Sequence, residues 1–172
     1  MEVGEEVVEV DFQAVVEEVS VGVGLQGTGE KTMNFSKEDE AKIVAAICEA
    51  ESKTSGEIRV HVAKQIKKSV YAEACATFEK LGMTKTQERN GILIFLVSDR
   101  KEFSIIGDLG IHQKVGGEFW DHIRNAIQDD FKKGEFAKGL VEGVLACGEA
   151  LSKYFPYQSN DQNELSDVTS HS

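Results

Sequence analysis

The run from Ile92 to Val97 most constrains what this chain folds into, because every residue in it is apolar. A half-buried strand alternates polar and apolar side chains, whereas an unbroken apolar run of this length is typical of a β-strand covered on both faces. Such a strand needs a layer packed on each side of its sheet. The run therefore predicts an α/β architecture with this strand at its centre.

The segments before this central strand have clear patterns of their own. Residues 57–63 alternate apolar and polar side chains, which predicts a second strand with one more polar face. Apolar residues at helical spacing predict a helix over residues 69–81, with Gly82 as its stop. A strand, a helix and a further strand in this order are expected to form a right-handed parallel crossover.

The remaining segments complete the sheet and its covering. Ser98–Lys101 is a tight connection into a third strand over residues 102–106, so the second and third strands are expected to form an antiparallel hairpin. A capping-box-like sequence at Ser36 starts a first helix, and helical periodicity predicts two more over residues 117–132 and 136–154. The predicted fold is a three-layer α/β/α sandwich with a small mixed sheet and about four helices.

Charge divides the chain into three parts. The net charge is −11, of which residues 1–32 carry −7 and the segment from Pro156 carries −3, so the middle is nearly neutral. We interpret residues 33–155 as one domain and residues 1–32 as an acidic Val/Glu/Gly-rich extension that is disordered or non-native. Residues 156–172 are an acidic tail, in which Pro156 is expected to end all regular structure. The domain has no basic stripe, so nucleic acid is not an expected partner.

The location of the protein and the state of its cysteines are also expected from sequence. No stretch approaches about 18 consecutive apolar residues, so no membrane span is expected. The first residues lack the basic and apolar regions of a signal peptide, which favours the cytoplasm. Cys48, Cys75 and Cys147 lie far apart, and we interpret them as reduced core residues rather than as a disulfide framework or a zinc site.

The predicted topology gathers polar side chains at one end of the sheet. The two parallel strands start at the end where the antiparallel third strand finishes. That end carries four residues with oxygen ligands: Glu57, Glu88, Asn90 and Asp108. Carboxylate and amide oxygens are the hard ligands that Ca²⁺ and Mg²⁺ prefer, which makes these residues the predicted cation site. The alternative is that the acidic groups cap helices and stabilise turns without any metal.

Other polar and aromatic residues are second choices. Asp99 in the hairpin and Asp129 and Asp130 near a helix end are candidate cation ligands. A turn role for Asp99 and a solvated face for the other two are the competing interpretations. His112 lies beside the acidic end and is a candidate catalytic acid or nucleophile. Trp120 is a candidate pocket wall, although its helical spacing favours the core or its rim.

Several short sequence motifs occur in a characteristic order. They are Thr54-Ser55-Gly56-Glu57-Ile58, Arg89-Asn90-Gly91-Ile92-Leu93-Ile94, Asp99-Arg100-Lys101, Ile106-Gly107-Asp108-Leu109-Gly110-Ile111 and Lys133-Gly134-Glu135-Phe136-Ala137-Lys138-Gly139. Together they resemble the TPM domain, the family of thylakoid-lumen acid phosphatases, photosystem II repair proteins and many bacterial proteins. The end of the chain resembles a short, soluble bacterial subgroup, and the resemblance covers about residues 35–167.

The resemblance implies an α/β/α sandwich, divalent-cation binding in several members, and phosphatase activity in at least the plant branch. The chain departs from the family at its acidic loops: Arg89 stands where the family has Asp, and the segments 107–112 and 115–116 also differ. The expected function is a soluble TPM-like domain that binds Ca²⁺ or Mg²⁺. The alternatives are a metal-dependent acid phosphatase acting on a phosphate ester, and a metal-free stress or interaction module whose protein partner is unknown.

Overall fold

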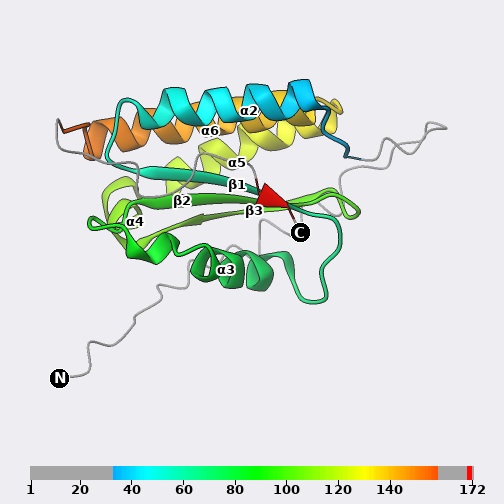
Figure 1. Cartoon of the computed structure of the whole chain (residues 1–172), viewed down its shortest axis with the longest axis horizontal. Coiled ribbons are helices and arrows are strands. Elements are labelled where there is room, and N and C mark those ends of the chain that lie inside the picture. Colours follow the sequence, from blue (N-terminus) through cyan, green and yellow to red (C-terminus); the bar gives the residue numbers. More distant parts are fainter. Residues whose placement is uncertain (1–32, 159–169, 172) are drawn as a thin grey trace.

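A computed structural model of the chain describes residues 33–158 and 170–171, in which one mixed sheet lies between layers of helices (Figure 1). The strands are β1 (Glu57–Ala63), β2 (Gly91–Val97), β3 (Glu102–Gly107) and β4 (Ser170–His171), in the order β3-β2-β1-β4. β1 is parallel to β2 and to β4, whereas β2 and β3 are antiparallel. The predicted α/β fold with a small mixed sheet is confirmed. The predicted extension over residues 1–32 lies outside the described residues.

Strand β2 is the centre of the fold, as its apolar run predicts. It is buried along its whole length and pairs with β1 on one side and with β3 on the other. Successive side chains of a strand point to opposite faces of the sheet. The side chains of β2 accordingly alternate between two hydrophobic cores. One core contains Ile92, Ile94 and Leu96, and the other contains Leu93, Phe95 and Val97. Both faces are covered, which explains why the strand has no polar alternation.

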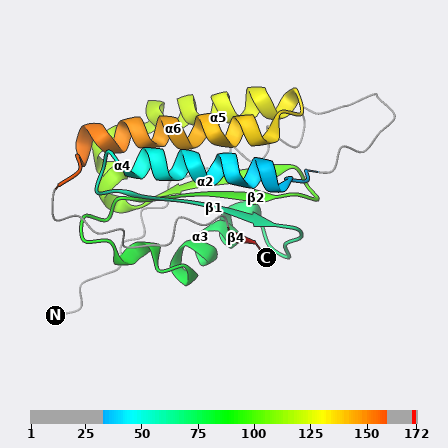
Figure 2. The same ribbon diagram turned by 45° about the horizontal axis from the view of Figure 1, so that its top comes forward.

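Three long helices cover one face of the sheet (Figure 2). They are α2 (Lys37–Glu51), α5 (Gly117–Lys132) and α6 (Phe136–Tyr154). The predicted capping box begins α2, where Ser36 Oγ accepts from Asp39 N at 3.1 Å and Asp39 Oδ2 accepts from Ser36 N at 3.0 Å. Helices α2 and α6 approach closely, because a Cβ on Gly148 would lie only 2.5 Å from the Cβ of Ala50.

The opposite face is covered by α3 (Val70–Lys80), which is followed by the short 3₁₀-helix η1 (Met83–Lys85). Ser69 caps α3, since its hydroxyl accepts a hydrogen bond from Ala72 N at 3.2 Å. Phe78 and Met83 pack against the second core of the sheet. The two helix layers and the sheet between them form the expected sandwich. Among the helices within residues 33–158, none is long and apolar enough to cross a membrane.

A further helix, α4 (Leu109–Val115), occupies a segment that the sequence analysis treats as a loop. Asp108 is its N-cap and accepts a hydrogen bond from Leu109 N at 2.8 Å. Gly110 lies inside this helix, where a Cβ would be only 2.0 Å from the carbonyl oxygen of Glu88. Glycine is therefore required at this position by the close approach of another backbone segment.

Two other expectations are wrong. Pro156 does not end all regular structure, because residues 170–171 pair with β1 as β4, and a two-residue strand leaves no periodic signal in the sequence. Cys48 is exposed on the outer side of α2 rather than in the core, while Cys75 is half-buried and Cys147 is buried. Burial raises the pKa of the Cys147 thiol to about 12.

His61 connects β1 to its two neighbours. Its ring stacks on Phe95 of β2 with centroids 5.3 Å apart, and its Nδ1 lies 2.6 Å from Ser170 Oγ of β4. Burial, with a smaller contribution from the nearby His171, lowers the pKa of His61 to about 4. The folded protein therefore keeps this imidazole neutral at pH values where the unfolded chain protonates it.

Replacement of Gly110 by Ala should destabilise the protein by about 2 kcal/mol or more, because the new methyl group would overlap backbone that cannot move aside. The matched control is Gly117→Ala, since nothing lies within 4 Å of a Cβ at that position and Ala favours a helix. Urea unfolding followed by circular dichroism measures both variants. Equal stability of the two variants would contradict the close approach at Gly110.

His61 should make the protein less stable as the pH falls from 6.5 to about 4. The folded-state pKa lies below the unfolded-state value, so the unfolded chain binds more protons in this window, with a slope of up to about 1.4 kcal/mol per pH unit. Below about pH 4 this contribution is constant.

The measurement compares urea unfolding of the wild type and His61→Gln across this pH range. The stability advantage of the wild type should shrink as the pH falls through the window. His122 is exposed, and His122→Gln should reproduce the wild-type profile. Parallel profiles for the wild type and His61→Gln would show that the buried imidazole has no linkage to folding.

Candidate functional site

The register of the sheet brings three loops together at one end. Glu57 pairs with Gly91 and Ile92 pairs with Gly107, so the segments before β1, before β2 and after β3 meet there. The backbone N–H of Asp108 donates to Gly91 O at 2.9 Å, which fixes the third loop to the start of β2. The loops therefore converge as the predicted topology requires.

Two predicted cation ligands, Glu88 and Asn90, are linked through Ser55. Ser55 Oγ donates to Glu88 Oε2 at 2.6 Å, and Asn90 Nδ2 donates to Ser55 Oγ at 3.2 Å. Asn90 is 1% exposed, and its Oδ1 has no hydrogen-bond partner within residues 33–158 and 170–171. A buried acceptor without a donor costs about 1–3 kcal/mol. This oxygen is therefore a candidate ligand for a cation or an ordered water.

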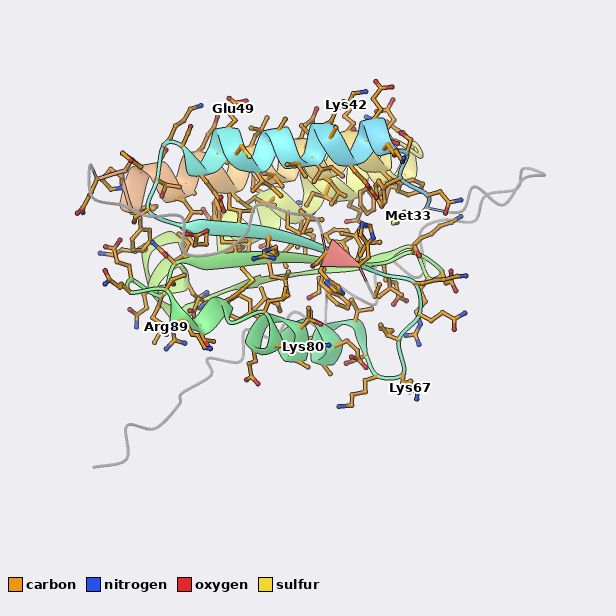
Figure 3. The ribbon with its side chains drawn as sticks, in the orientation of Figure 1. Met33, Lys42, Glu49, Lys67, Lys80 and Arg89 are labelled. Carbon is orange, nitrogen blue, oxygen red and sulfur yellow. The ribbon has the colours of Figure 1, made fainter. Side chains whose placement is uncertain are left out.

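Asp108 is engaged differently, by a two-pronged ion pair with Arg89. Arg89 Nε lies 2.7 Å from Asp108 Oδ2 and its Nη2 lies 2.8 Å from Oδ1, while Oδ1 also accepts from Leu109 N. Figure 3 shows Arg89 at the loop end of the sheet, on the side of α3. Its φ of 51° is uncommon for a residue with a side chain. Both carboxylate oxygens of Asp108 are thus engaged, and they hold the loop that carries Arg89 against the start of α4.

Of the remaining predicted ligands, Glu57 lies at this end of the sheet and the second-choice residues lie elsewhere. Glu57 is buried at the first position of β1, whereas Asp99 in the hairpin turn and Asp129 on α5 are exposed. In the described ranges 33–158 and 170–171, no group of three or more His, Cys, Asp or Glu side chains is placed to hold a metal ion. Cation binding by the first-choice or second-choice residues stays a prediction.

Asp130 was expected on a solvated helix face, but that expectation is wrong, because the residue is buried. Lys138 Nζ lies 2.9 Å from its Oδ1, and Lys133 Nζ lies 3.8 Å from the same atom. The hydrogen bond from Lys138 lowers the pKa of Asp130, and the same bond raises the pKa of Lys138. Asp130 therefore ties the end of α5 to the first turns of α6, a contact that periodicity within one helix does not reveal.

His112 and Trp120 occupy different environments. Trp120 is buried in the core, and the absence of a side chain on Gly107 makes room for its ring, since a Cβ there would lie 2.4 Å from Trp120 Cη2. Trp120 thus has the core role that its spacing favours. His112 lies on α4 and lines a small cavity together with Arg89. Its Nδ1 is buried and has no hydrogen-bond partner in the described part of the chain.

Sequence reasoning missed two residues that organise this end of the sheet, Ser55 and Arg89. Ser55 follows a helix and precedes β1, so its place beside the start of β2 follows from the parallel register. The signal for Arg89 is that a basic residue stands directly between Glu88 and Asn90, two of the predicted cation ligands. Nothing in the sequence signals its left-handed backbone, because Asn, Asp and Gly are the residues that commonly adopt it.

Comparison with known proteins gives one family. The sequence matches the TPM-domain family model over residues 31–150. No curated protein sequence matches the chain. The resemblance found from the sequence motifs is confirmed by the family match.

Solved structures are similar to this chain. The BA42 protein from the psychrophilic bacterium Bizionia argentinensis is 44% identical, and the match covers 84% of this chain and 100% of BA42 with a TM-score of 0.77. The N-terminal domain of a P. gingivalis protein is 20% identical over 73% of this chain and 81% of its own, with a TM-score of 0.60. The N-terminal domain of the Corynebacterium glutamicum protein cg2496 is 14% identical over 80% and 90%, with a TM-score of 0.58. The last two show likeness of fold.

The ion pair between Arg89 and Asp108 should contribute measurably to folding. Asp108 is nearly buried, with 5% of its side chain exposed, but Arg89 is 46% exposed, so solvent screens the pair and we expect a coupling free energy of about 1–2 kcal/mol. The cycle uses Arg89→Asn, Asp108→Asn and the double variant, with urea unfolding as the measurement. Asn suits the positive φ at position 89 and remains a helix cap at position 108. Strict additivity of the two single effects would mean that the pair stabilises nothing.

Proposed function

This chain belongs to the TPM-domain family, and from that premise we propose that it binds a divalent cation, Ca²⁺ or Mg²⁺, at the loops that meet at one end of its sheet. One observation carries the proposal. Asn90 Oδ1 is a buried oxygen that has no hydrogen-bond partner among the described residues, next to the Ser55–Glu88 pair. A bound cation would give this oxygen the positive partner that the described residues do not supply there.

The ligands present are those of a hard cation. Glu88 offers a carboxylate, Asn90 an amide oxygen and Ser55 a hydroxyl oxygen, and Ca²⁺ or Mg²⁺ completes its coordination with water where protein oxygens are few. Glu57, the buried carboxylate that starts β1, belongs to the proposed set as the second acid of this end. Asp108 is left out, because Arg89 and Leu109 already occupy both of its oxygens.

A cation at this place would join two loops that are distant in the sequence. Ser55 lies before β1, whereas Glu88 and Asn90 lie before β2. The role proposed for the metal is therefore to stabilise these loops and the surface that they form. The metal-dependent phosphatase and the metal-free interaction module are the alternatives, and the experiment below separates all three.

Titration of the EDTA-treated full chain with CaCl₂ or MgCl₂ should give saturable backbone amide shifts at residues 54–57 and 86–91. At a free metal concentration of one hundred times Kd, the free energy of unfolding should rise by about 2.7 kcal/mol. Glu88→Gln removes one exposed carboxylate and should weaken binding by about tenfold, since charge is lost from the ligand set. Glu149→Gln, the same change on an exposed position of α6, should bind like the wild type.

The same samples decide between the alternatives. Hydrolysis of p-nitrophenyl phosphate that requires the metal and is lost in Glu88→Gln would support the phosphatase. Shifts without hydrolysis support the binding domain that we propose. An absence of saturable shifts at residues 54–57 and 86–91, or equal affinities of Glu88→Gln and the wild type, would remove the cation from this site.

A further inference from the structure

A second site lies on the other side of the Thr86–Asn90 loop. It is a cavity of about 80 Å³ between α3, the end of β3 and α4. Six of the residues that line it carry the argument: Cys75, Phe78, Glu79, Arg89, Ile106 and His112. Ser55, Glu88 and Asn90 do not line this cavity, so it is separate from the proposed cation site.

The size and the walls of the cavity suit a short apolar group. A volume of about 80 Å³ corresponds to about three water molecules at roughly 30 Å³ each, which suits an organic acid of a few carbon atoms. Phe78 is buried in the second core, and Ile106 is packed against that core, so one side of the cavity is hydrocarbon. Apolar surface of this kind gains free energy when it is covered by an alkyl chain instead of water.

The polar side of the cavity offers hydrogen-bond donors. Arg89 lines it with a guanidinium held in place by Asp108, and a planar guanidinium matches the geometry of a carboxylate. His112 lines it as well, and its buried Nδ1 has no partner among residues 33–158 and 170–171. With the tautomer that carries a proton on Nδ1, His112 becomes a second donor. An oxygen acceptor placed beside Nδ1 would satisfy this nitrogen.

The charges around the cavity favour one negative charge over two. Arg89 is the positive group of the lining, and its partner Asp108 lines the cavity as well, so the pair is close to neutral. Glu79 also lines the cavity, but it is exposed and solvent screens its charge. A phosphate dianion would therefore meet too little positive charge, whereas a monoanion with an apolar chain matches both sides. We propose that this cavity binds a small aliphatic monocarboxylate, with its carboxylate on Arg89 and His112 and its alkyl chain against Phe78 and Ile106.

Sodium butyrate is the probe for the first test. Titrated into the ¹⁵N-labelled full chain, it should give saturable amide shifts in α3 and at residues 106–112, with a Kd of about 1 mM. Butyramide has the same shape without the charge and should give no saturable shifts there, and inorganic phosphate should bind more weakly than butyrate. An absence of butyrate shifts at these residues, equal binding of butyramide, or tighter binding of phosphate would each overturn the proposal.

Two variants of the ion pair should change butyrate affinity in opposite directions. Arg89→Asn removes the cation and should weaken binding by about tenfold. Asp108→Asn removes the charge that neutralises Arg89 and should tighten binding by about threefold. The double variant should bind as weakly as Arg89→Asn. A merely apolar cavity predicts one affinity for all four proteins, and that result would contradict a carboxylate site.

The cysteines allow a test that needs no variant and so does not depend on variant folding. Cys75 lines the cavity, Cys48 is exposed on α2 across the sheet, and Cys147 is buried with a raised pKa. Butyrate at twice its Kd should slow alkylation of Cys75 by iodoacetamide about threefold while the rate at Cys48 is unchanged, as read by mass spectrometry. Unchanged labelling of Cys75, or equal slowing at both cysteines, would place butyrate outside this cavity.

Discussion

The parallel pairing of β1 with β2 is the constraint on which the rest of this structure depends. It runs in continuous register from Glu57 beside Gly91 to Ala63 beside Val97. If β1 slipped by one residue against β2, each β1 side chain would move to the opposite face of the sheet. The polar side chains of β1 would then enter the larger core, which now holds its apolar ones. The register also decides which loops meet, so the candidate sites follow from the same pairing that builds the cores.

The sequence was most informative where a side chain's burial depends on its own periodic position. The bounds of β1, α5 and α6 agree with the patterns, since an apolar stripe records directly which face is covered. The missed helix α4 has a recognisable cap in Asp108, but Gly110 weakened the pattern. Gly110 has no room for a side chain because the backbone of Glu88, in another loop, lies against it. A local sequence pattern cannot reveal a contact with backbone that is distant in the sequence. Asp130 is the same case, because its partner Lys138 lies in the next helix.

The candidate site was predictable in its place but not in its contacts. The convergence of the loops that carry Glu57, Asn90 and Asp108 follows from topology alone. Which of these side chains contact one another depends on backbone angles that cannot be predicted from the residue types. Arg89 is the clearest example, because its positive φ directs the guanidinium to Asp108 and removes that carboxylate from the proposed ligand set.

Arg89 and its two neighbours in the same short loop contact different parts of the protein. Its neighbours Glu88 and Asn90 both contact Ser55, on the side of the proposed cation site, while Arg89 itself contacts Asp108 beside α4. An acidic residue at position 89 would have added its charge to the other acids of this end and left Asp108 without a cationic partner. An arginine there instead closes the loop onto α4 and places a guanidinium in the wall of a cavity. The residue at position 89 thus decides how charge is shared between two adjacent surfaces at this end of the sheet.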